Sequence, residues 1–163
     1  MSPSLLEYQS ALSSKDVWTT EPVQAVPSAS KVLIPLPGGI SVLVEGTPPR
    51  WLAPCVESLT SVSTLPPNWD SYGSRTIDSR AVYHALILLT QTMGTNSPPP
   101  QVVPTSRGRI QLEWHRRGVD LQIEIAPSGR YSAAFERNGG TSEISGIVSQ
   151  TKELSEFIRA VEG

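Results

Sequence analysis

The sequence predicts an α+β protein in which an antiparallel sheet packs against helices. Residues 109–137 contain three segments that alternate apolar and polar side chains, as strands with one buried face do. Residues 32–44 contain two apolar segments around a Pro-Gly-Gly turn, which is typical of a hairpin. Apolar side chains recur at helical spacing in residues 51–63, 76–93 and 149–161. We therefore expect a meander and a hairpin in one sheet, covered by three helices.

The length and composition predict a single domain after an N-terminal arm. The chain has 163 residues, of which 38% are hydrophobic and 17% charged, and this is enough for one globular core. Residues 1–30 are rich in Ser, Thr, Ala and Pro, so we expect a flexible arm there. Residues 31–163 then form the α+β domain.

The first elements of the domain are the hairpin and a helix. Pro35 has no amide donor, which predicts that its strand lies at an edge. In residues 51–63 the apolar side chains are spaced for one helical face, and Pro54 is tolerated in the first turn.

The helix predicted over residues 76–93 has so wide an apolar surface that it should be largely buried. Ser74 or Thr76 could cap its start, and Asp78 suits the positive end of its dipole. Gly94 should end it. A short strand over residues 101–104 then leads to the meander.

The register of the meander follows from its two short turns. With all apolar side chains on one side, Leu121 faces Trp114 on one neighbouring strand and Phe135 on the other. The remaining core pairs are Leu112–Ile123, Ile110–Ile125, Ile123–Ala133 and Ile125–Tyr131. A last short strand over residues 141–147 and the C-terminal helix over residues 149–161 complete the chain.

The opposite face of the meander carries a histidine among carboxylates. His115, Asp120 and Glu136 form one row, and Glu113 and Glu124 belong to the rows beside it. Such a set could act as a general base with an orienting acid or as metal ligands. Solvated cross-strand ion pairs are the alternative, and we favour them because polar sheet faces usually contact water.

The most distinctive segment is the loop Asn68-Trp69-Asp70-Ser71-Tyr72-Gly73-Ser74, which precedes the central helix. It groups polar and aromatic side chains, and we predict a binding site formed by Asn68, Trp69, Asp70 and Tyr72. In the alternative, the two aromatic side chains anchor the loop in the core and Asp70 caps the loop's own backbone.

This loop also carries a resemblance. Together with Pro104-Thr105 through Gly108, Leu112-Glu113-Trp114 and the strand from Leu121, it resembles a group of small uncharacterised bacterial proteins. Their pattern is N-W-D-G-Y-G-A, a helix, P-T-x-x-G-x-I-x-L-E-W and an amphipathic strand. Ser71 and Ser74 stand here in place of Gly and Ala. The resemblance covers residues 65–137 and implies a bacterial origin, but it implies no activity.

The charge and the motifs argue against several classes of function. A net charge of −2 is unfavourable for a protein that mainly neutralises phosphates. Nucleic-acid binding is therefore disfavoured but stays open, through Arg107, Arg109, Arg116, Arg117 and Arg130. Phosphate-binding glycine loops, G-x-S-x-G elbows and H-x-x-x-H spacing are absent. We expect no cofactor and no metal site.

The single cysteine and the hydropathy indicate in which cellular compartment the protein is expected. Cys55 has no partner for an internal disulfide, which fits a reducing compartment, and we expect it to be a small buried residue. No apolar run approaches the roughly 20 residues that cross a bilayer. The N-terminus lacks the pattern of a signal peptide. We expect a cytoplasmic protein without membrane contact.

Two functional hypotheses follow. The first is a non-enzymatic accessory or regulatory subunit of a bacterial system, which binds another protein encoded nearby. The second is a small metal-dependent hydrolase or nuclease that uses His115 as base with Asp120, Glu136, Glu113 or Glu124 as acid or ligand. We expect the first, because the sequence lacks known catalytic motifs.

Overall fold

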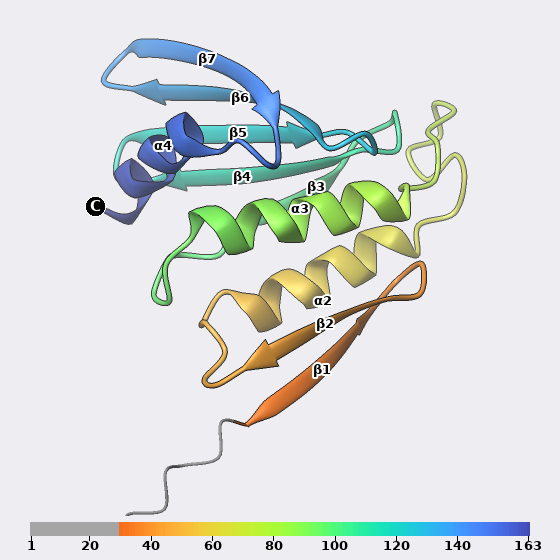
Figure 1. Ribbon diagram of the computed structural model, residues 1–163. Coiled ribbons are helices and arrows are strands. Elements are labelled where there is room, and N and C mark those ends of the chain that lie inside the picture. The colour runs from red at the N-terminus through yellow and green to blue at the C-terminus, as the bar shows by residue number, and fades with distance from the viewer. Residues whose placement is uncertain (1–29) are drawn as a thin grey trace, which may run out of the picture.

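The computed structural model describes residues 30–163. Figure 1 shows the elements in chain order. They are β1 (Lys31–Leu36), β2 (Ile40–Glu45), α2 (Leu52–Ser63), α3 (Ser79–Thr92), β3 (Gln101–Pro104), β4 (Ile110–Arg116), β5 (Val119–Ile125), β6 (Arg130–Arg137), β7 (Gly140–Ile147) and α4 (Lys152–Glu162). The α+β class predicted from the sequence is confirmed.

The meander has the predicted register. Leu121 pairs with Trp114 on β4 and with Phe135 on β6, and His115 pairs with Asp120. β3 and β7 extend the meander to a five-stranded antiparallel sheet with the order β3-β4-β5-β6-β7. The alternation of apolar and polar residues therefore gives the sheet one apolar and one polar face, as expected.

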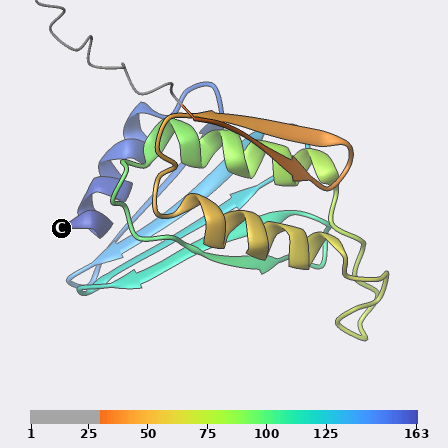
Figure 2. The same cartoon turned by 90° about the horizontal axis from the view of Figure 1, so that it is seen from below.

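The helices cover only the apolar face of this sheet, and the polar face is left open (Figures 1 and 2). α3 supplies six buried side chains to the core, which are Ala81, Val82, Ala85, Leu86, Leu88 and Leu89. α4 lies over β5, where Leu154, Ile158 and Val161 are buried. The ring of Phe157 on α4 stacks on Phe135, with 4.6 Å between the ring centroids. The predicted burial of the central helix is confirmed.

The hairpin differs from the expectation that it joins the meander in one sheet. β1 and β2 form a two-stranded sheet of their own, on the side of α2 and α3 away from the large sheet (Figure 1). One face of the hairpin consists of apolar side chains that pack toward the helices, namely Ile34, Leu36, Ile40, Val42 and Val44. The hairpin thus covers the second side of the helices, because these are apolar on more than one face.

The start of α3 also differs from the prediction. Asp78 is the N-cap, and its carboxylate accepts a hydrogen bond from the backbone N–H of Arg80 at 2.9 Å. The helix does not begin near Ser74 or Thr76, because residues 74–78 run alongside the turn before β4. There Arg75 N–H donates to the carbonyl of Ser106 at 2.9 Å, and Asp78 N–H donates to the carbonyl of Gly108 at 3.0 Å.

The predicted arm over residues 1–30 lies outside the described residues, apart from Ser30. Between residues 30 and 163, no helix combines the length and the apolar character that crossing a membrane requires.

Candidate functional site

The candidate residues lie at two separate places. Asn68, Trp69, Asp70 and Tyr72 belong to the loop between α2 and α3, which projects from one end of the molecule (Figures 1 and 2). The histidine and the carboxylates lie on the open face of the five-stranded sheet.

The loop over residues 65–74 is held by hydrogen bonds between its own groups. The carboxylate of Asp70 accepts from the backbone N–H groups of Tyr72 at 2.8 Å and Ser74 at 3.1 Å. The side-chain oxygen of Asn68 accepts from Gly73 N–H at 2.7 Å, and Asn68 N–H donates to the carbonyl of Ser74 at 2.8 Å. Two short polar side chains therefore organise the turn, as Asn and Asp commonly do.

The backbone of this loop enters the left-handed region three times. φ is 62° at Asn68, 65° at Ser71 and 87° at Gly73. Asparagine tolerates this region and glycine enters it without steric penalty. Serine enters this region less readily than either, so Ser71 is the least favourable of the three positions.

The loop exposes one aromatic side chain. Tyr72 is 93% exposed, while Trp69 is half-buried and its indole N–H has no hydrogen-bond partner among the described residues. The expectation that both aromatic side chains anchor the loop therefore fails for Tyr72. The expectation that Asp70 caps its own backbone is confirmed, and the hydrogen bond from Tyr72 N–H lowers the pKa of this carboxyl.

On the open face, the structure brings His115 together with two carboxylates. His115 Nδ1 lies 2.5 Å from Asp120 Oδ1, and Nε2 lies 3.3 Å from Glu113 Oε2. Glu136 pairs with Asp120 in the strand register but makes no ion pair with His115. Glu124 belongs to another pair, since Arg109 Nη1 lies 2.6 Å from its Oε1. Three of the five predicted residues are thus in contact.

The pair on β4 and β5 leads to a prediction about protonation. The hydrogen bond to Asp120 is the main cause of the raised pKa of His115, and the one to Glu113 comes second. A raised folded pKa means that the stabilising effect of the charged imidazole is complete below the unfolded pKa of about 6.5 and is lost as the pH rises through the folded pKa. We expect Asp120→Asn to bring the pKa of His115 down toward about 6.5, and Glu113→Gln to have a smaller effect.

Titration of the His115 imidazole protons by NMR measures this pKa in each variant. A pKa that Asp120→Asn leaves unchanged, or that Glu113→Gln lowers more, would contradict the assignment of the pairs.

Metal binding has no geometric support in the part of the chain that the structure describes. Within residues 30–163, no group of three or more His, Cys, Asp or Glu residues is arranged to hold a metal ion. The ring nitrogens of His115 are instead engaged by the two carboxylates.

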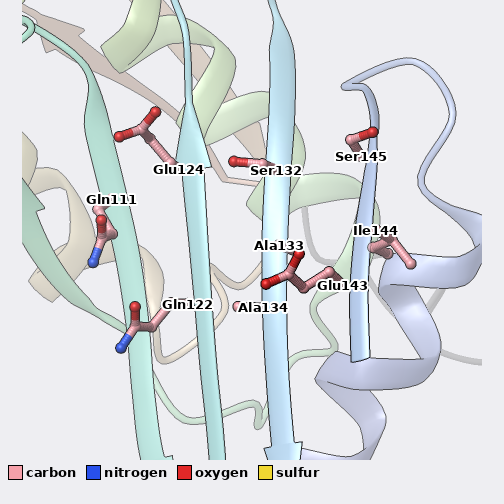
Figure 3. A pocket seen from close by; sticks show the side chains of 9 residues that line it. All are labelled: Gln111, Gln122, Glu124, Ser132, Ala133, Ala134, Glu143, Ile144 and Ser145. Atoms are coloured by element: carbon pink, nitrogen blue, oxygen red, sulfur yellow. The ribbon is translucent and has the colours of Figure 1, made fainter. Parts of the chain in front are cut away.

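The open face is hollowed beside these residues. A hollow of about 550 Å³ extends across β4, β5, β6 and β7. Its floor consists of small side chains such as Ser132 and Ala134, while Gln111, Gln122 and Glu143 rise around them (Figure 3). The contribution of Glu143 from β7 was missed in the sequence, although the predicted strand over residues 141–147 places alternate residues on this face.

Two further reactive side chains are Cys55 and His84. Cys55 is 1% exposed, and burial raises the pKa of its thiol to about 12. It is therefore a small buried residue, as predicted, and not a nucleophile. The half-buried His84 lies against Gly129 in the turn between β5 and β6.

The chain was also compared with known proteins. No protein-family model, curated protein or solved structure matches it. The functional interpretation therefore depends on the geometry of the loop and of the sheet face.

Proposed function

We propose that this chain is a non-enzymatic protein-binding module, an accessory or regulatory subunit of a bacterial system, and that its loop over residues 65–74 contacts the partner. We also propose a cytoplasmic location and a partner encoded nearby. The observation that carries the proposal is the 93% exposure of Tyr72 on a loop whose backbone is held by Asn68 and Asp70.

Tyrosine is well suited to this role. Its ring buries a large area on association, and it is enriched among the few residues that carry most of the affinity of an interface. A loop that is already ordered loses less conformational entropy on binding than a flexible one. The hydrogen bonds of Asp70 and Asn68 therefore favour binding by presenting Tyr72 in a defined position.

The alternative of a small hydrolase or nuclease has one observation in its favour, the close pair of His115 and Asp120. This arrangement resembles a base and its orienting acid. However, the hollow of about 130 Å³ next to Asp120 is lined by Glu136 and Glu143 but not by His115. The imidazole also faces two carboxylates and is itself exposed, as in a solvated ion pair. We therefore favour the binding module.

Tyr72→Ser tests the proposal. We expect this variant to bind the partner at least about 30-fold more weakly, because truncating a central interface tyrosine removes about 2 kcal/mol or more. The tagged protein and the variant are used for affinity capture from the native host at equal expression, and the affinity for the recovered partner is then measured with purified proteins.

Tyr83→Ser is the matched control, since Tyr83 is 41% exposed on α3 and outside the loop. It should bind as the unchanged chain does. A chain that is recovered alone, or a partner that Tyr72→Ser retains with full affinity, would refute the proposal.

A further inference from the structure

Another hollow lies directly beside the loop. Its volume is about 620 Å³, and it is bounded by the end of the loop, the start of α3 and the turn before β4. Ser74, Gly108 and Pro127 contribute to its wall. The side chains that distinguish it are three arginines, Arg75, Arg80 and Arg107.

Within the described part of the chain, the hollow is lined by more positive than negative side chains, because Asp78 is the one carboxylate beside its three arginines. The guanidinium group of Arg80 donates two hydrogen bonds to the carboxylate of Asp78, from Nε at 3.1 Å and from Nη2 at 2.8 Å. Arg75 and Arg107 are exposed, and neither forms an ion pair with a carboxylate in residues 30–163. Two uncompensated guanidinium groups therefore line the hollow of a chain whose net charge is −2.

The backbone holds the two arginines at fixed positions. Arg75 N–H donates to the carbonyl of Ser106, the residue before Arg107, at 2.9 Å. The segments approach so closely that a Cβ on Gly108 would lie 2.6 Å from the carbonyl oxygen of Thr76. The hollow is thus formed by two paired segments that are far apart in the sequence.

We propose that this hollow binds the carboxylates of an acidic segment of the protein partner. The proposal rests on the function proposed above, and it specifies the chemistry of the partner next to Tyr72. The planar guanidinium group donates two parallel hydrogen bonds to one carboxylate, so Arg75 and Arg107 can each receive an acidic side chain. Asp78 keeps Arg80 occupied and limits the number of anions bound.

A polypeptide fits this site better than a nucleic acid. A nucleic acid is bound by a continuous row of cations along its phosphates. Here the arginines of the meander divide between opposite ends of the sheet. Arg107, Arg109 and Arg130 lie at one end, where Arg109 is paired with Glu124, and Arg116 and Arg117 lie at the other end, where β4 turns into β5. The open face between the ends carries carboxylates, among them Asp120 and Glu136. These would repel a long polyanion.

A hexaglutamate peptide is the probe for the test. It is titrated at low ionic strength into the full chain, and the NMR signals of the arginine side chains report the site and the affinity. We expect Arg75→Ser and Arg107→Ser each to weaken binding about threefold to tenfold, as for partly exposed charge pairs. We expect about 0.15 M salt to weaken it further.

The control is Arg137→Ser, which makes the same change of charge at the far end of β6. Its affinity should stay within about twofold of the unchanged chain. Urea unfolding shows that each variant is folded.

Three results would overturn the proposal. They are the absence of hexaglutamate binding, an equal loss in Arg137→Ser, and tighter binding of a short oligothymidylate through the same arginines. Tyr72→Ser should keep its affinity for hexaglutamate. The hexaglutamate titration therefore tests the hollow alone, and the partner capture with Tyr72→Ser tests the proposed function separately.

Discussion

Replacing Leu121 by alanine is expected to lower the free energy of unfolding by about 2–5 kcal/mol. Leu121 is fully buried on the central strand β5, between Trp114 and Phe135 in the register. α4 packs over the same strand. Removal of the side chain loses its burial and leaves a cavity, because neighbours on both sides are held by their strands.

Gln122→Ala is the matched control for this prediction. Gln122 is the next residue on β5, but its side chain is exposed on the open face. We expect a change within about 0.5 kcal/mol. Urea unfolding of the two variants and the unchanged chain gives the free energies. Similar losses for the two neighbours would contradict the assignment of the buried and open faces.

Gly108→Ala is expected to lower the free energy of unfolding by about 2–5 kcal/mol, from two additive effects. φ at Gly108 is +76°, and a residue with a Cβ in this left-handed region lowers the free energy of unfolding by about 1–2 kcal/mol. The new Cβ would also lie 2.6 Å from the carbonyl oxygen of Thr76, and such overpacking costs about 1–3 kcal/mol. The segments around Thr76 and Gly108 then have to move apart, which strains the hydrogen bond from Asp78 N–H to the carbonyl of Gly108.

Gly118→Ala separates the two effects. Gly118 has a similar φ of +72°, but no atom lies within 4 Å of the position of an added Cβ. Only the conformational penalty of about 1–2 kcal/mol applies there. Equal losses in urea unfolding would show that the segments carrying Arg75 and Arg107 can separate freely. The positions of these arginines would then not be held by the close approach at Gly108.

The meander could be predicted in detail because its information is local. Side chains of a strand alternate with a fixed period, and the short turn around Arg117 and Gly118 leaves a single register that keeps the apolar side chains together. The start of α3 could not be predicted in this way. Residues 74–78 have partners at Ser106 and Gly108, and nothing in the local pattern indicates these hydrogen bonds.

The candidate sites divide in the same manner. The sequence indicated the loop and the capping by Asp70, since short polar side chains act on their own backbone. It did not indicate which aromatic side chain is exposed, because burial depends on the elements that pack around the loop. The basic hollow was also missed, since Arg75 and Arg107 meet only when their segments pair.

The sequence by itself determined the order of the strands and helices, the two faces of the sheet and the pairing of His115 with Asp120. These depend on residue spacing and on the chemistry of short turns. Only the tertiary structure decided that the hairpin lies on the far side of the helices, that Tyr72 is exposed, and that two arginines share one hollow. The reason is that each of these features depends on contacts between segments distant in the chain.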